Sequence, residues 1–222
     1  PFEYANLGSP VVATALEAAS GERYDKLLER TVFKPRGVEA CANWIGCSDD
    51  MVSRAVALYR HTDEPARDYP SDLPPDCSIP VAEGVECSLD DYVPGTNASV
   101  FSPQGGVRIG MMDLAKIGQW LMLAPERGEY SPPVLKRIAR EVVGNQNFEQ
   151  EFFCTYGLHI QLINLKSRDC LDVLFEDNEL GYLGHSGEAY GLQSGLWFDQ
   201  KARAGVVYFR TQAPPPAGGE DT

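Results

Sequence analysis

Gly184-His185-Ser186-Gly187-Glu188, between the apolar stretches 179–183 and 192–198, is the part of the sequence on which the fold assignment depends. A histidine, a hydroxyl and a glycine in succession, at the end of a predicted strand, suit a sheet edge that faces a substrate. The imidazole can hold a charge or a proton near neutral pH, the hydroxyl donates and accepts, and glycine allows a ligand to come close. Taken alone, the tripeptide is more typical of a loop with a surface histidine, so the rest of the chain must decide.

The composition is that of a globular protein. With 43% hydrophobic and 23% charged residues, the 222 positions can bury one large core or two smaller ones. No run of about 18 apolar residues predicts a membrane-spanning helix, and no basic segment followed by an apolar one predicts a signal peptide in these residues. The net charge of −13, from 32 acidic and 19 basic residues, argues against a nucleic-acid partner.

The six cysteines fall into three local pairs: Cys41 with Cys47, Cys77 with Cys87, and Cys154 with Cys170. Three short-range disulfides are the favoured interpretation, and six free thiols are the alternative. Disulfides would place folding in an oxidising compartment, such as a periplasm or the cell exterior. Because there is no Cys-x-x-Cys motif and there are only three histidines, we expect no zinc site and no other metal or cofactor.

Apolar periodicity predicts helices in the first part of the chain and strands in the second. Helices are expected over 11–19, 24–32, 111–122 and 132–143, with a further amphipathic segment over 50–60. Strands are expected over 155–165, 171–175, 181–185, 192–199 and 205–211, with a hairpin turn at 199–202. Helices followed by an antiparallel meander predict an α+β fold.

This pattern divides the chain into three parts. Residues 1–150 are expected to form a helical, loop-rich region, residues 151–213 part of an antiparallel sheet, and residues 214–222 a disordered, proline-rich tail. Local disulfides would hold the long stretch 38–103, which contains four of the six cysteines and is rich in Pro, Asp, Ser and Gly, notably over 63–80.

Three short motifs occur in an order and at separations that match a known family. Tyr4-Ala5-Asn6 opens the helical region, Gly105-Gly106 precedes a helix, and His185-Ser186-Gly187 lies among the strands. The chain resembles the serine β-lactamase and penicillin-binding-protein superfamily, which has Tyr-x-Asn and Lys/His-Thr/Ser-Gly motifs. It is most similar to class C β-lactamases, DD-carboxypeptidases and related esterases. The resemblance covers about residues 2–211, includes the looser segment 33–38, and implies a β-lactamase/transpeptidase-like fold.

The sequence departs from that family in one respect that matters for chemistry. The nucleophile of the family lies in a Ser-x-x-Lys motif upstream of Tyr-x-Asn, and no Ser-x-x-Lys occurs in these 222 residues. We expect the motif in an N-terminal segment of the same, larger polypeptide. The alternative is a relative that has lost its chemistry.

The resemblance assigns catalytic roles to the tyrosine motif. Tyr4 would shuttle a proton to and from the acyl-enzyme, with its pKa lowered by a neighbouring positive charge. Its alternative role is an aromatic packed beside Phe2. Asn6 would hydrogen-bond the substrate or hold the lysine, and a helix N-cap is the alternative.

The second motif supplies the other predicted site residues. His185 takes the place where β-lactamases more often have lysine, and Ser186 would bind the carboxylate or leaving group of the substrate. The Glu188 N–H, directly after Gly187, would form half of an oxyanion hole. Arg108 and Arg210 are either aids to an anionic substrate or solvated surface charges, while His61 and His159, which lack a motif, are expected to be structural.

The predicted function is that of a serine hydrolase acting through an acyl-enzyme on a small molecule or peptide. A neutral imidazole attracts a substrate carboxylate less than an ammonium does. The substitution therefore favours an esterase, amidase, carboxypeptidase or D-amino-acid peptidase over a strong β-lactamase. The rival hypothesis is a catalytically inactive binding protein of the same fold. Either protein would be periplasmic or secreted.

Overall fold

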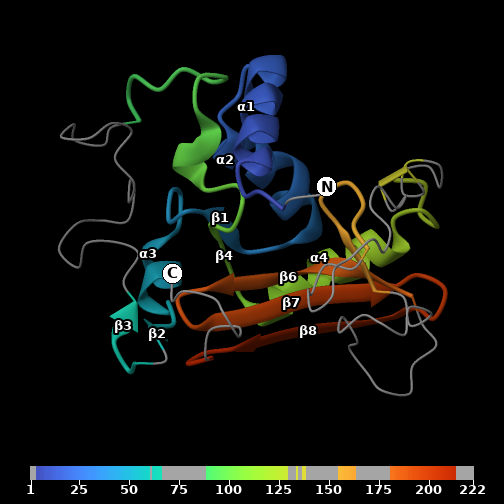
Figure 1. The fold of residues 1–222 in the computed structure, drawn as a ribbon. Coiled ribbons are helices and arrows are strands. Elements are labelled where there is room, and N and C mark those ends of the chain that lie inside the picture. The colour runs from blue at the N-terminus through green and yellow to red at the C-terminus, as the bar shows by residue number, and fades with distance from the viewer. Residues whose placement is uncertain are drawn as a thin grey trace.

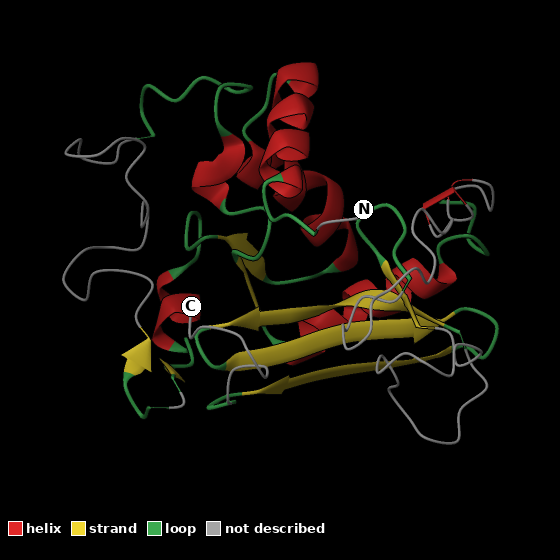
Figure 2. Cartoon of the chain, in the orientation of Figure 1, coloured by secondary structure: helices red, strands yellow, loops and turns green. Residues whose placement is uncertain are grey.

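The computed structural model describes residues 4–60, 62–66, 89–129, 155–163 and 181–213, together with positions 134, 137 and 138. A helical region lies above an antiparallel sheet, and one further helix lies behind that sheet (Figures 1 and 2). The predicted α+β class is therefore confirmed.

The helices are α1 (Gly8–Ser20), α2 (Tyr24–Leu28), α3 (Asp49–Ser53) and α4 (Met111–Leu123), with the shorter turns η1 (Glu29–Phe33), η2 (Lys34–Arg36) and η3 (Ala98–Phe101). The strands are β1 (Ala40–Ala42), β2 (Leu58–Tyr59), β3 (Pro65–Ala66), β4 (Val107–Ile109), β5 (Gln161–Ile163), β6 (Tyr182–Ala189), β7 (Leu192–Asp199) and β8 (Ala204–Arg210).

Helix α1 ends where the sequence predicts. Gly21 adopts a left-handed conformation (φ 69°) that suits glycine, and its N–H donates to the Glu17 carbonyl, which terminates the helix. The inner face of α1 packs on η3 and α2, and the core beneath it consists of Ala13, Ala42, Ile45, Ala98, Val100 and Phe101.

A buried carboxylate joins α1 to the segments around it. Glu17 is fully buried and accepts three hydrogen bonds: from the Tyr24 N–H (2.7 Å), the Tyr92 hydroxyl (2.6 Å) and the Gly95 N–H (2.9 Å). Its charge is thus compensated by donors from two distant segments. Beside Glu17, a side chain at Gly95 (φ 89°) would lie 2.9 Å from the Ala18 Cα, so this approach requires glycine.

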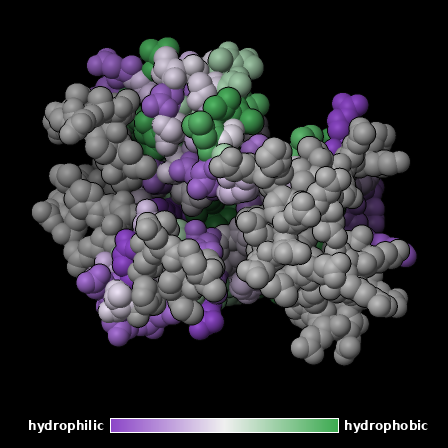
Figure 3. All heavy atoms as spheres, viewed as in Figure 1, coloured by the Kyte–Doolittle hydropathy of each residue, from purple (hydrophilic) through white to green (hydrophobic). Residues whose placement is uncertain are grey.

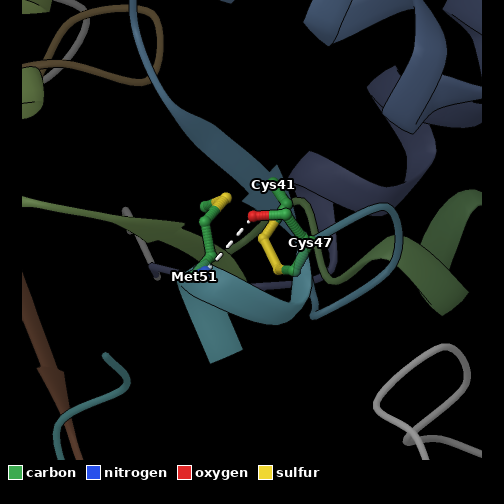
Figure 4. Close-up of a disulfide and its surroundings, with 4 residues drawn as sticks. Cys41, Cys47 and Met51 are labelled. Carbon is green, nitrogen blue, oxygen red and sulfur yellow. Dashed lines mark hydrogen bonds between the residues drawn. A yellow bond between two sulfur atoms is a disulfide. The ribbon is translucent and has the colours of Figure 1, made fainter. Parts of the chain in front are cut away.

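Strands β1 and β4 form a two-stranded antiparallel ribbon, in which Cys41 pairs with Arg108. A disulfide from Cys41 to Cys47, with 5.2 Å between the Cα atoms, closes the turn that follows β1 (Figure 4). The next residue, Ser48, caps α3 by accepting a hydrogen bond from the Met51 N–H (3.2 Å). The first predicted disulfide is therefore confirmed.

Arg36 joins the end of η1 to helix α4. Its guanidinium lies 3.5 Å from the ring centroid of Trp120 on α4 and donates to the carbonyls of Thr31 (2.8 Å) and Val32 (3.0 Å). The side chain thus supplies donors to the end of η1 and stacks on an aromatic face.

The main sheet has the order β5-β6-β7-β8, with every pair antiparallel. Tyr190 and Gly191 both have positive φ and form the two-residue turn between β6 and β7. The Asp199 carboxylate accepts from the Ala202 N–H (2.7 Å) in the turn before β8, as the sequence predicts. One face of the sheet carries the core residues Ile163, Tyr182 and Trp197, and α4 packs on β7 and β8.

Three sequence predictions are corrected by these elements. The segment 50–60 is not one helix, because α3 ends at Ser53 and the short strand β2 follows. The strand expected over 155–165 is much shorter, since β5 begins only at Gln161. Strand β6 extends to Ala189, so the His-Ser-Gly motif lies within the strand rather than at its end.

Several predictions concern residues outside the described ranges: the strand at 171–175, most of the helix at 132–143, the tail at 214–222, and the cysteine pairs Cys77–Cys87 and Cys154–Cys170. The division of the chain at residue 150 also stays a prediction. Within the described ranges, no helix is long and apolar enough to cross a membrane.

Candidate functional site

Three aromatic rings from distant parts of the sequence meet beside β6. The ring centroid of Tyr4 lies 5.9 Å from that of His185 and 6.0 Å from that of Tyr156. The Tyr156 and His185 centroids are 5.8 Å apart. The structure therefore brings together the first residue of the Tyr-x-Asn motif and the first residue of the His-Ser-Gly motif.

Tyr4 is placed by the start of α1. The N–H groups of Gly8 and Ser9 donate to the carbonyls of Ala5 and Asn6 (both 3.3 Å), which turns the chain into the helix. A Cβ at Gly8 would lie 3.2 Å from the His159 ring, so the helix start lies directly against the segment 155–163 (Figure 1). Tyr4 remains 40% exposed, which leaves it accessible to a substrate.

The segment 155–163 folds back on itself beside β6. Tyr156 forms a bridge with Gln161, the Gly157 N–H donates to the Ile160 carbonyl (2.8 Å), and His159 takes a positive φ of 53° within the turn. The turn places Tyr156 and Gln161 side by side, and both are buried, at 7% and 2% exposure.

The hydrogen bonds of His185 define its tautomer. Nδ1 lies 2.5 Å from the Ser186 carbonyl oxygen, which can only accept, so Nδ1 carries a hydrogen. Nε2 lies 2.9 Å from the Tyr156 hydroxyl. In the neutral imidazole, Nε2 is the acceptor and the Tyr156 hydroxyl donates to it.

The environment favours the neutral forms of these side chains. Burial lowers the pKa of His185, and the nearby His159 adds to this lowering, against the opposing effect of the Ser186 carbonyl. Burial, together with the neighbouring Tyr4, raises the pKa of Tyr156 to about 12. The Tyr156 phenol therefore keeps its hydrogen at neutral pH and can donate it.

The pKa of Tyr4 in these residues is set by burial, and the lowering expected in the complete site stays a prediction. Burial raises the pKa of Tyr4, whereas a neighbouring positive charge was expected to lower it.

Ser186 is held through its backbone. Its N–H donates to the Gln161 Oε1 (2.7 Å), in the place where a neighbouring strand would otherwise accept. Strand β5 pairs with β6 only from Tyr182 to Gly184, so the side chain of Gln161 extends the hydrogen bonding one step further along β6.

Gly187 and Glu188 continue β6 beyond the end of β5. Gly187 is opposite Ser194 of β7, whose hydroxyl donates to the Gly187 carbonyl (3.4 Å). Alternate residues of a strand direct their N–H groups to the same side. The Glu188 N–H therefore points to the same side as that of Ser186, where β5 no longer pairs with β6.

Of the remaining predicted site residues that the structure describes, two are exposed and one stacks on an aromatic ring. Asn6 is exposed, and the N-cap position of α1 is Leu7, so Asn6 is not the helix cap. Arg108 stacks over the Trp44 ring (4.7 Å) on the β1–β4 ribbon, and Arg210 is exposed on the outer strand β8. His61 lies outside the described residues.

Tyr156 and Gln161 are the site residues that the sequence did not indicate. Neither lies in one of the family motifs. The apolar pattern predicts a continuous strand over 155–165, whereas the structure has a turn before β5 that brings the two residues together. The signal that could have found them is the Tyr156-Gly157 pair, since glycine often marks a turn within an apolar segment. Across the described ranges, no three His, Cys, Asp or Glu side chains converge as they would to hold a metal ion.

The chain matches one protein family along its whole length. The beta-lactamase family model matches residues 1–222, the whole chain. A comparison with curated proteins found no match.

Several solved structures share the fold. The D-amino acid amidase from Ochrobactrum anthropi in complex with D-phenylalanine is 15% identical, with a TM-score of 0.60 over 96% of this chain and 52% of that one. A D-stereospecific amidohydrolase from Streptomyces sp. is 14% identical, with a TM-score of 0.59 over 96% and 50%. A class C beta-lactamase from Rhodobacter sphaeroides is 16% identical, with a TM-score of 0.59 over 96% and 56%.

Identities this low show similarity of fold alone, and the fold they share is the expected β-lactamase-like one. The chain spans about half the length of each of these structures.

Proposed function

Because the chain belongs to the beta-lactamase family, we propose that it forms part of a serine hydrolase that cleaves an amide, an ester or a D-amino-acid peptide through an acyl-enzyme. The observation that carries the proposal is the convergence of Tyr4 and His185, with 5.9 Å between their ring centroids, from the two motifs of the family.

The roles follow from the chemistry of each group. A serine activated by a lysine, in a Ser-x-x-Lys segment outside these residues, would attack the carbonyl carbon. Tyr4 would pass the proton between the serine, the leaving group and water. The Glu188 N–H, on the side of β6 that β5 leaves unpaired, would donate to the oxyanion. Asn6 and Ser186 would bind the substrate, and Gly187 would leave room for it.

The charge of His185 supports an amide or ester substrate over a β-lactam. Burial lowers the pKa of His185, so the side chain offers no positive charge to a substrate carboxylate at neutral pH. The D-amino acid amidase and the D-stereospecific amidohydrolase of the same fold support testing amides of D-amino acids first. The Cys41–Cys47 disulfide supports a periplasmic or secreted location.

The test is hydrolysis by the full-length polypeptide. We expect it to release the amine from a D-amino-acid amide faster than it opens a chromogenic cephalosporin. Replacing the serine of Ser-x-x-Lys by alanine should abolish turnover. A full-length sequence without that motif, with no turnover of amides or esters, would favour the inactive binding protein instead.

A further inference from the structure

The turn formed by residues 155–163 contacts the His-Ser-Gly strand at two successive residues. Tyr156 contacts the side chain of His185, and Gln161 contacts the backbone of Ser186. We propose that Tyr156 and Gln161 are positioning residues. Together they fix His185 as an uncharged, oriented ring and hold β6 where it passes the end of β5. This deepens the proposed function and rests on it.

Tyr156 donates a hydrogen bond to the imidazole of His185. Nδ1 of His185 already donates to the Ser186 carbonyl (2.5 Å), which leaves Nε2 as the acceptor of the neutral ring. The Tyr156 hydroxyl, 2.9 Å away, donates to that nitrogen. With both ring nitrogens bound to protein groups, His185 is oriented in the ring plane and is not available as a general base.

Gln161 acts on the backbone. The Ser186 N–H can only donate, so the atom facing it is the amide oxygen of Gln161 (2.7 Å). This assignment directs the Gln161 Nε2 elsewhere, and it is a buried donor with no hydrogen-bond partner among the described residues. Burying such a donor costs free energy. A buried glutamine at this position is therefore poorly explained by packing alone, and we attribute it to the bond that its oxygen makes.

Among the described residues, aromatic and apolar side chains lie around His185. Tyr4 comes from the start of α1, Tyr156 and His159 from the turn, and Leu196 of β7 lies directly opposite in the sheet. The neutral imidazole, held by the Ser186 carbonyl and the Tyr156 hydroxyl, favours a substrate whose group beside His185 is uncharged, as in an amide or ester, over one with a carboxylate there.

Nuclear magnetic resonance of the full-length protein, with ¹⁵N-labelled histidine, tests the Tyr156 contact without any need for activity. We expect His185 to be the Nδ1–H tautomer at neutral pH, assigned by its loss in His185→Asn. Tyr156→Phe should shift the Nε2 resonance toward that of a nitrogen without a hydrogen-bond donor. Tyr24→Phe, which removes a hydroxyl from the helical core, should leave that resonance unchanged. A wild-type protein with its hydrogen on Nε2 would overturn the proposal.

Amide hydrogen exchange tests the Gln161 contact in the same protein. Gln161→Met, which keeps the size of the side chain and removes the acceptor, should speed exchange of the Ser186 amide by roughly ten-fold, the effect of one hydrogen bond. Gln161→Glu keeps an acceptor oxygen and should restore slow exchange. An unchanged exchange rate of the Ser186 amide in Gln161→Met would overturn the role proposed for Gln161.

The two proposals can fail separately. If the resonance and exchange results hold while the protein cleaves no amide or ester, the proposed function is wrong and the positioning contacts stand. If the protein is active, Tyr156→Phe and Gln161→Met should each lower kcat/KM by about ten-fold, equivalent to about 1.4 kcal/mol. Full activity with an unchanged His185 resonance would overturn the positioning roles and leave the function intact.

Discussion

His185 is the residue whose charge has the most consequences. Since burial lowers its pKa in the folded protein, the unfolded chain binds the proton more readily, with an ordinary pKa near 6.5. Between the lowered pKa and about 6.5, the unfolded state holds more protons than the folded state, so stability rises with pH in this window. Above about pH 7, His185 is uncharged in both states, so its titration no longer changes the free energy of unfolding.

Urea unfolding at several pH values measures this effect. We expect wild type to lose more stability than His185→Asn between pH 7 and pH 5, because the asparagine variant lacks the titrating group and shares all the others. Parallel losses in the two proteins would contradict a lowered pKa for His185.

Substitution of His185 tests its role toward the substrate. In the complete enzyme, His185→Ala should lower kcat/KM by about ten-fold or more, the loss expected from an interaction of over about 1.4 kcal/mol. His185→Lys should raise the rate on a carboxylate-bearing β-lactam relative to that on an amide, because an ammonium attracts the carboxylate. An unchanged ratio of the two rates in the lysine variant would count against the specificity argument.

The sequence predicted the site residues that lie in motifs and missed the residues that hydrogen-bond to those motifs. The two family motifs predicted that Tyr4 and His185 lie in one site, and the rings do meet. Tyr156 and Gln161 enter the site through a turn whose His159 has a positive φ, which apolar periodicity does not reveal.

Among the elements, α1 depends on the carboxylate at its centre. Replacing Glu17 by leucine would leave three donors unsatisfied, those of Tyr24, Tyr92 and Gly95. We expect Glu17→Leu to destabilise the helical region by about 3 kcal/mol, the usual cost of leaving buried polar groups unpaired. The matched control is Glu22→Gln, at a half-exposed carboxylate paired with Arg30 (2.7 Å), which should lower the melting temperature much less because exposed ion pairs contribute little. A melting temperature unchanged in Glu17→Leu would show that this cluster does not stabilise the fold.

The turn after β1 depends on its disulfide, which joins residues only six positions apart. Closing so short a loop should stabilise the fold by about 2 kcal/mol. Reduction should raise the mass by two hydrogens per bridge and lower the melting temperature, and non-reducing peptide mapping should link Cys41 with Cys47. Free, alkylated Cys41 and Cys47 in the unreduced protein would contradict both the bridge and the argument for export.

The elements that the sequence predicted well are those whose apolar pattern fixes one buried face. Helices α1 and α4 and strands β7 and β8 agree with their predicted ranges to within a few residues. The short strands β2 and β3 were not predicted, and β5 was predicted too long, because two or three residues carry no period. Their strand geometry comes from pairing with neighbours distant in sequence.

At the scale of the whole molecule, the outer face of α1 is apolar and uncovered by the described residues. The exposed fractions are 71% at Leu7, 60% at Val11, 48% at Val12 and 46% at Leu16. These side chains form a hydrophobic surface over the helix (Figure 3). Apolar patches of this kind mark interaction surfaces. Since the chain spans about half of the structures that share its fold, we propose that further parts of a longer polypeptide cover it.

We propose that residues 1–222 hold most of a hydrolase site and that its nucleophile lies outside them. No serine of these 222 residues, Ser9 and Ser186 included, has a lysine three positions on.

Intact-mass analysis after treatment with a fluorophosphonate tests this claim most directly, on residues 1–222 and on the full-length protein in parallel. We predict no adduct on residues 1–222 and a single adduct on the full-length protein, located by peptide mapping at the serine of a Ser-x-x-Lys motif. Stoichiometric labelling of residues 1–222, at Ser186 or at any other serine, would contradict a nucleophile outside these residues.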